Sequence, residues 1–129
     1  MDIRRINPPG IHEPRGYSHI VIWRELVYIA GQISLDLERN VLGAGDARVQ
    51  AVNIWENIEY ALGTVGSHLE DLIKVNIYVV GVDNVPMVRE VCTGIWARGV
   101  HPASTLVVVS ALATEELLVE IEAIAALRT

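Results

Sequence analysis

Apolar residues recur every three or four positions in two stretches of the chain, which is the spacing of one face of an α-helix. The first stretch begins at Asp46, whose side chain can cap a helix by accepting backbone N–H groups, and ends just before Gly66. The second begins at Asp83, which is expected to cap it, and ends before Gly99. The predicted apolar faces are Ala47, Ala51, Ile54, Ile58, Leu62 and Val65 in the first helix and Val85, Val88, Cys92, Ile95 and Trp96 in the second.

Other stretches alternate between apolar and polar residues or are almost continuously apolar, which is typical of β-strands. Such strands are predicted within residues 18–33, 72–80, 103–109 and 117–127. The first of these stretches is interrupted by Arg24-Glu25, so it forms either a two-stranded hairpin or one long bent strand. In the second, alternation places Ile73, Val75, Ile77 and Val79 on one side and Lys74, Asn76 and Tyr78 on the other.

The two remaining segments carry Pro, Gly and Asn and lack a repeating pattern. Residues 1–17 are predicted to be an irregular arm, because their prolines remove backbone donors. Residues 34–45 are predicted to be a loop.

The element order is therefore ββαβαββ, which predicts one α+β domain over residues 1–129. Strands joined through a helix are expected to be parallel, and the first and last pairs are expected to be antiparallel hairpins. Two helices cover only one face of the sheet, yet residues 103–109 are apolar on both sides. A partner subunit is the simplest cover for the other face.

Composition favours the same conclusion and excludes several classes of protein. Apolar residues make up 51% of the chain, more than one small core usually takes, which points to a subunit interface. No apolar run is long enough for a membrane span, and the N-terminus lacks the apolar stretch of a signal peptide, so a cytoplasmic protein is expected. The net charge of −6, with ten scattered basic residues, disfavours nucleic-acid binding.

Two glutamates in the last predicted strand are the strongest candidates for chemistry. Glu120 and Glu122 are two residues apart, so they point to the same face of a strand, about 7 Å from each other. If that face is buried, a carboxyl group gains a raised pKa that suits acid–base catalysis; if it is wet, both glutamates are simply solvated. Cys92 is expected to be a core residue, and the four histidines show no metal-ligand spacing, so no metal is predicted.

Several segments, in order and spread over essentially the whole chain, resemble the RidA/YjgF family of enamine/imine deaminases, which is also known as the endoribonuclease L-PSP family. They are Arg15–Ser18, Val27–Gln32, Gln50 with Asn57, Val65-Gly66, Leu72–Lys74, Pro102-Ala103 and Val119–Ala125. The resemblance implies a chorismate-mutase-like fold, with the two helices on one face of a mixed sheet. It also implies a homotrimer with three sites in the clefts between subunits and no cofactor.

Family members of the deaminase type hydrolyse reactive enamines and imines, such as 2-aminoacrylate, to 2-keto acids and ammonia. The resemblance implies Tyr17 as a cleft residue and Glu120 as the acid that positions or activates water. Gly31 would let the backbone approach the ligand, next to Ala30, where the family has serine.

Two further positions depart from the family pattern. The arginine that follows Pro-Ala in family deaminases and forks onto the substrate carboxylate is Ser104 here. Losing such a contact costs roughly 2–4 kcal/mol of binding, so the substrate is expected to differ from a simple 2-imino acid. Arg89 stands where the family has an asparagine on the second helix. It either supplies the cation that is missing at position 104 or is a solvated arginine paired with a nearby acid.

The sequence thus predicts a cytoplasmic homotrimer that deaminates, or tautomerises, a small enamine or imine. The alternatives are a non-catalytic metabolite-binding or chaperone-like trimer and, less favoured by the acidic charge, an endoribonuclease.

Overall fold

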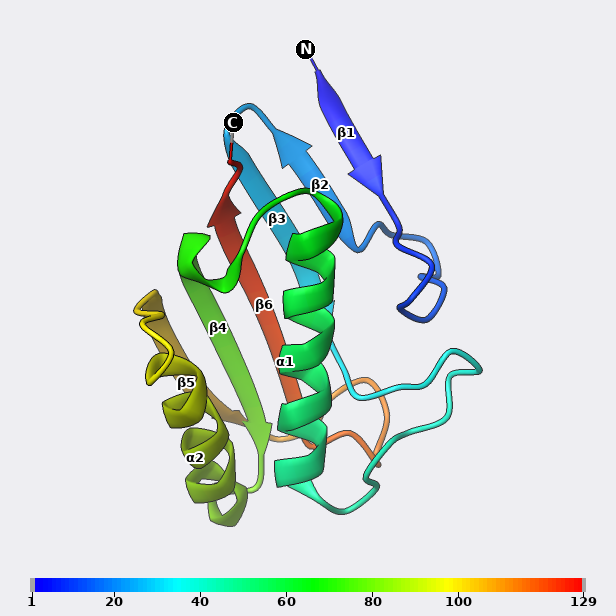
Figure 1. Ribbon diagram of the computed structural model, residues 1–129. Coiled ribbons are helices and arrows are strands. Elements are labelled where there is room, and N and C mark those ends of the chain that lie inside the picture. Colours follow the sequence, from blue (N-terminus) through cyan, green and yellow to red (C-terminus); the bar gives the residue numbers. More distant parts are fainter. Residues whose placement is uncertain (1, 129) are drawn as a thin grey trace.

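Six strands form one mixed sheet, in the order β1-β2-β3-β6-β4-β5, in the computed structural model, which describes residues 2–128 (Figure 1). The strands are β1 (Ile3–Ile6), β2 (Ile20–Trp23), β3 (Leu26–Gln32), β4 (Leu72–Val80), β5 (Ala103–Val109) and β6 (Val119–Ala126). The helices are α1 (Ala47–Thr64) and α2 (Val85–Trp96), with the short 3₁₀ turns η1 (Leu69–Asp71) and η2 (Val82–Asn84). The predicted α+β class with two helices on a mixed sheet is confirmed.

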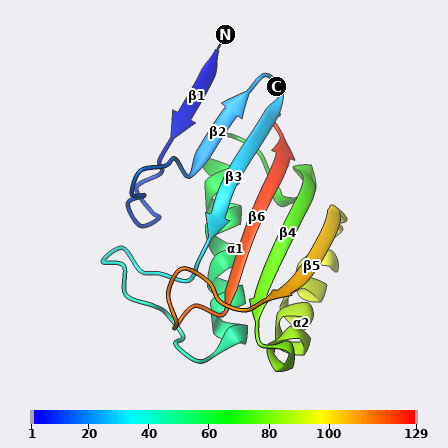
Figure 2. The same ribbon diagram turned by 180° about the vertical axis from the view of Figure 1, so that it is seen from behind.

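The strand pairing agrees with the prediction at the first hairpin and differs at the last strand. β2 and β3 pair antiparallel, with Arg24 in the turn at a φ of 56°, and β4 and β5 are parallel. The predicted hairpin between the last two strands is wrong, because β6 pairs with β3 on one side and β4 on the other. The strands on either side of α1, β3 and β4, run parallel as predicted, but they do not pair with each other, because β6 lies between them and is antiparallel to both. Residues 110–118 form a loop that carries the chain from the edge of the sheet to its centre (Figure 2).

The N-terminal arm is not wholly irregular, as the sequence suggested. Ile3–Ile6 pair antiparallel with β2 and form the edge strand of the sheet. A partner strand with free backbone groups stabilises these residues despite the prolines that follow, because Pro8 and Pro9 lie beyond the last pair.

The cap predicted for α1 is confirmed and the cap predicted for α2 is wrong. Asp46 accepts a hydrogen bond from the backbone N of Val49 at 3.1 Å. Asp83 instead lies in η2, and α2 begins two residues later, after Asn84. Pro86 stands in the first turn of α2, where its missing N–H costs no hydrogen bond.

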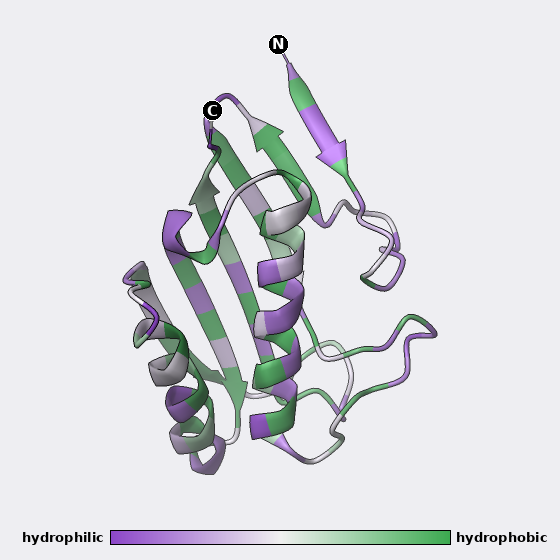
Figure 3. Ribbon diagram, in the orientation of Figure 1, coloured by the Kyte–Doolittle hydropathy of each residue, from purple (hydrophilic) through white to green (hydrophobic). Residues whose placement is uncertain are grey.

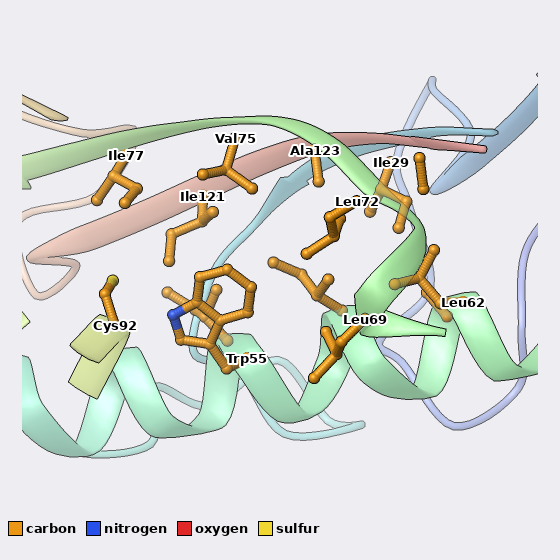
Figure 4. Close-up of a cluster of buried hydrophobic side chains, with 14 of the residues drawn as sticks. Ile29, Trp55, Leu62, Leu69, Leu72, Val75, Ile77, Cys92, Ile121 and Ala123 are labelled. Atoms are coloured by element: carbon orange, nitrogen blue, oxygen red, sulfur yellow. The ribbon is translucent and has the colours of Figure 1, made fainter. Parts of the chain in front are cut away.

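Both helices pack on the same face of the sheet, and the core lies between them and β3, β6 and β4 (Figure 4). In this core Trp55 of α1 lies below Ile121 of β6 and toward Ile77 of β4, whereas Leu62 of α1 lies at the other end of the cluster. The middle of β4 and the first half of β6 alternate between hydrophobic and hydrophilic residues, whereas the second half of β6 is apolar (Figure 3). Ile73 departs from the predicted alternation: the pairing register shifts beside it, so Leu72 takes the inward position and Ile73 is 46% exposed.

The opposite face of the sheet carries no helix, as the view from behind shows (Figure 2). Neighbouring apolar residues of edge strand β5 are exposed on both faces, with Val107 at 42% and Val108 at 48%. This strand is therefore apolar on both sides, as predicted, but nothing within residues 2–128 covers it. No helix in the described residues is both long and apolar enough to cross a membrane.

We expect the protein to be a trimer in solution, because burying these exposed apolar residues needs a second chain. Sedimentation equilibrium should give three times the monomer mass, and Val107→Lys should shift the distribution toward smaller species. Val52→Lys is the matched control, since Val52 is similarly exposed, at 41%, on α1. A wild type that stays monomeric at micromolar concentration would contradict the expectation.

Candidate functional site

The two glutamates predicted to share a face do so, on the helix-free side of β6, but their surroundings differ. Oε1 of Glu122 accepts hydrogen bonds from the Tyr78 hydroxyl at 2.6 Å and from Nδ2 of Asn76 at 3.1 Å. The first of these bonds raises the pKa of Tyr78 above its ordinary value, because it stabilises the protonated hydroxyl. Glu122 is thus a held carboxylate that ties β6 to β4.

Glu120 lies opposite Tyr78 in the strand register and is partly buried. Within residues 2–128 no side chain or backbone group donates a hydrogen bond to its carboxyl group. Burial raises the pKa of Glu120, and the charge of Glu122 raises it further. Of the two carboxyl groups, Glu120 is therefore the one that is free to exchange a proton.

A β-bulge in β3 makes room for the Glu120 side chain. The register between β3 and β6 shifts between Ile29 and Gln32, so Ala30 and Gly31 stand together opposite one residue of β6. A Cβ atom on Gly31 would overlap the Glu120 carboxyl group. The lack of a side chain at Gly31 therefore admits Glu120. The approach of the Gly31 backbone to a ligand, expected from the sequence, stays a prediction.

A buried chain of hydrogen bonds fixes this bulge to the N-terminal arm. Nε2 of His19 donates to the backbone oxygen of His12 at 2.7 Å, which leaves Nδ1 of His19 to accept from Nε2 of Gln32 at 3.2 Å. The same nitrogen of Gln32 donates to the backbone oxygen of Ala30 at 3.0 Å. Burial, followed by the charges of His19 and Arg39, lowers the pKa of His12 to about 4, so this ring is neutral at pH 7.

Tyr17 is positioned by this network. Its ring packs edge-on against His19, with centroids 5.5 Å apart, while the side chain stays 44% exposed. Burial raises the pKa of Tyr17; the charge of Arg39 acts against this and that of Glu120 adds to it. Tyr17 therefore lies within electrostatic range of both Glu120 and Arg39.

A hollow of about 330 Å³ lies on the helix-free face beside Glu122, and Glu120 is not among its lining residues. It is lined by Ser18, Val21, Tyr28, Ile29, Ala30, Lys74, Asn76, Glu122, Ala123 and Ile124. Nζ of Lys74 donates to the hydroxyl of Thr105 at 2.7 Å, so this cation is not bound to an acid. The hollow combines an apolar floor with a few polar groups, which is typical of a small-molecule site.

Arg89 and Ser104 lie elsewhere, on the helix side of the sheet. Together with Cys92 and Trp96 they line a hollow of about 360 Å³ between α2 and β5. Ser104 pairs with Val75, whose side chain faces the core, whereas Glu120 points from the opposite face. One chain therefore does not bring Arg89 and Ser104 together with Tyr17, Ala30, Gly31 and Glu120.

Arg89 and Cys92 both line this hollow, but neither the paired-arginine explanation of Arg89 nor a nucleophilic role of Cys92 is supported. Arg89 is exposed and takes part in none of the ion pairs found among residues 2–128; the neighbouring acid, Glu90, pairs with Arg48 at 2.8 Å. Burial raises the pKa of the Cys92 thiol, which keeps it protonated in the core as predicted. In the described part of the chain, no three His, Cys, Asp or Glu side chains are placed to hold a metal.

Sequence reasoning missed His19 and Gln32 as residues that position the site, and Arg39 as a cation near Tyr17. A lone histidine on an apolar strand gives no signal of its partner, because that partner lies in another element. Gln32 belongs to the Val27–Gln32 segment that carried the family resemblance, and a polar residue at an inward strand position was the signal that could have found it.

Residues 10–127 match the family model described as Endoribonuclease L-PSP. The chain belongs to the RidA/YjgF (endoribonuclease L-PSP) family. It is similar to a RutC family protein of Pyrococcus abyssi (strain GE5 / Orsay), at 32% identity over 109 residues that cover 84% of each chain. It is also 30% identical over 122 residues, 94% of each chain, to a 2-iminobutanoate/2-iminopropanoate deaminase of Dermatophagoides farinae.

The RidA fold is seen equally in a solved structure. A protein of unknown function of the conserved Rid family from Yersinia pestis superimposes with a TM-score of 0.89 at 25% identity, over 97% of this chain and 99% of that one. The mixed sheet with two helices on one face is therefore the RidA fold. Its strand β3 carries the bulge, and its strand β6 carries the two glutamates.

Replacing Gly31 by Ala should displace the Glu120 carboxyl group, because the added methyl overlaps it. We expect a large loss of whatever turnover the protein shows, with the fold retained, since the carboxyl is the flexible end of a side chain. Gly94→Ala is the matched control: a Cβ there meets no atom within 4 Å. Full activity of Gly31→Ala, measured alongside an unchanged circular dichroism spectrum, would contradict the placement of Glu120.

Proposed function

We propose that this RidA-family protein hydrolyses a reactive enamine or imine to a carbonyl compound and ammonia, with Glu120 as the acid–base group. The observation that carries the proposal is the contrast between the two carboxyl groups: Glu122 is held by Tyr78 and Asn76, whereas Glu120 has a raised pKa and no donor. A carboxyl group with a raised pKa keeps its proton to a higher pH than an ordinary glutamate, which favours exchange of that proton with a substrate.

The reaction needs only water and proton transfers, so no cofactor is invoked. Protonated Glu120 first gives its proton to the enamine carbon, which forms an iminium ion. Water then adds to the C=N carbon while Glu120 accepts its proton, which gives a carbinolamine. Glu120 next protonates the carbinolamine nitrogen, ammonia leaves as the carbonyl forms, and Glu120 takes back the remaining hydroxyl proton. One water is consumed, one carbonyl is formed, and Glu120 returns to its starting protonation state.

The position of the site supports a cleft between subunits. Arg89 and Ser104 face one side of the sheet and Glu120 the other, so a site that uses both sets must combine two chains. The proposed assembly is a cytoplasmic homotrimer, in which the Glu120 side of one subunit faces the α2–β5 side of the next.

The proposed substrate class depends on one relative and on one position, Ser104, that differs from the family pattern. The Dermatophagoides farinae relative is described as a 2-iminobutanoate/2-iminopropanoate deaminase, which supports imine hydrolysis. Ser104 stands where the family's carboxylate-binding arginine is expected, which favours a substrate other than a simple 2-imino acid. That same departure favours the rival proposal, a metabolite-binding trimer that catalyses nothing.

Replacing Glu120 by Gln should reduce turnover of imines generated in solution by about 10²–10⁴-fold, because the amide cannot exchange a proton. The readout is release of ammonia, and the oligomer should remain intact. Glu122→Gln is the control, since Gln can still accept the bonds from Tyr78 and Asn76; its loss should be far smaller. Unchanged turnover in Glu120→Gln would exclude Glu120 from the mechanism, and absence of turnover in the wild type would favour the binding protein.

The same variant has an effect on stability that does not depend on knowing the substrate. The pKa of Glu120 is higher in the folded than in the unfolded chain, so the folded state binds this proton more tightly and loses stability as pH rises through that interval. Glu120→Gln should therefore unfold at a higher temperature than wild type at pH 7. The difference should vanish below the ordinary pKa of a glutamate, about 4.3.

Replacing Ser104 by Arg should increase turnover of 2-aminoacrylate-type imines, because a guanidinium offers paired donors to a carboxylate. Arg89 lines the same hollow and would repel the new cation, so Ser104→Arg combined with Arg89→Asn should gain more. Rates for the wild type and both variants, each checked for an intact oligomer, test this. If neither variant gains, the carboxylate clamp is not what separates this chain from the deaminases.

A further inference from the structure

A third hollow, of about 630 Å³, lies at the end of the sheet where β3 ends and β6 begins. It is lined by Arg15, Ile33, Leu35, Arg39, Asn40, Val41, Ala113, Thr114, Glu116 and Leu117. The loops that follow β3 and precede β6 meet at this end of the molecule (Figure 2). Two arginines thus face one hollow in a chain whose net charge is −6.

Neither arginine is neutralised by an acid. Three ion pairs are found among residues 2–128, and Arg15 and Arg39 take part in none of them. The nearby carboxylate of Asp36 is occupied by its own turn, accepting from the backbone N of Glu38 at 2.9 Å and of Asn40 at 2.8 Å. Glu116, the one acid in the lining, is exposed.

Arg39 is held in place rather than free in solvent. Its backbone has a φ of 67°, a left-handed conformation that is unfavourable for a residue with a side chain. The Asp36 turn imposes this conformation, and Nη1 of Arg39 donates to the backbone oxygen of Glu13 at 2.8 Å, which fixes the guanidinium against the N-terminal arm. Its remaining N–H groups are free to bind an acceptor.

Chain connectivity relates this hollow to Glu120. Ile33 is two residues beyond Gly31, whose missing side chain admits the Glu120 carboxyl group, and Leu117 is three residues before Glu120. The lining therefore begins about 7 Å along the chain from Gly31 and about 10 Å along the chain from Glu120. A ligand that contacts both Arg39 and Glu120 must span this separation.

We propose that Arg39, assisted by Arg15, binds a carboxylate or phosphate group of a small molecule in this hollow. Resting on the proposed function, the substrate is then an imine or enamine whose anionic group is several bonds away from the C=N carbon. This placement differs from a carboxylate attached directly to the reacting carbon, for which the hollow is too distant.

Binding of glutarate and of inorganic phosphate, measured by isothermal titration calorimetry at low salt, tests the anion site without any turnover. The wild type should bind at least one of the two, and not the uncharged glutaramide. Arg39→Gln should weaken binding at least tenfold, Arg15→Gln should weaken it less, and Arg39→Lys should restore part of the loss. A strong preference between the two anions would identify the headgroup.

Arg24→Gln is the matched control, because Arg24 is also an arginine at positive φ, in the β2–β3 turn, with its guanidinium stacked on Trp23. Its binding should equal that of the wild type. No binding by wild type, or an equal loss in Arg24→Gln and Arg39→Gln, would overturn the anion site. Glu120→Gln should retain glutarate binding, so a failure of the proposed chemistry and a failure of this site give different results.

Discussion

The insertion of β6 between β3 and β4 is the arrangement on which the rest of this structure depends. A strand paired on both sides places one row of side chains, including Ile121, in the core under α1 and the alternate row, including Glu120, on the face without helices. The same insertion sets Glu120 against the bulge at Gly31. Core stability and the position of the acid are therefore fixed by one pairing register, and a slip of one residue would exchange the two rows.

Two carboxyl groups of the same strand acquire different chemistry from their neighbours alone. Tyr78 and Asn76 on β4 donate hydrogen bonds to Glu122, which hold its carboxyl group in place. Burial disfavours ionisation of Glu120, and the charge of Glu122 disfavours it further. The pair thus resembles other sites in which two neighbouring acids take different roles because their surroundings differ.

Local sequence patterns were sufficient to predict most helices and strands, but they were insufficient to predict which strands pair with each other. Periodicity gave α1 and its Asp46 cap, the β2–β3 hairpin and β4, because these depend on contacts close in sequence. The position of β6, the strand at the N-terminus and the bulge at Ala30 and Gly31 depend on partners far along the chain. Glu120 could be found from alternation and family resemblance, but its difference from Glu122 could not, since Tyr78 is 44 residues away from Glu122.

The positions where this chain departs from the family pattern and the positions where it keeps that pattern lie mostly on opposite sides of the sheet. Ser104 and Arg89 change the α2–β5 side, whereas Gly31, Tyr17 and Glu120 remain on the other side. In the proposed function, the acid and the position of the family's carboxylate clamp therefore belong to different surfaces of one chain, which meet only when subunits assemble in the proposed way. The clamp can then change while the acid is preserved, and the anion site proposed at Arg39 would bind a charge farther from the reacting carbon.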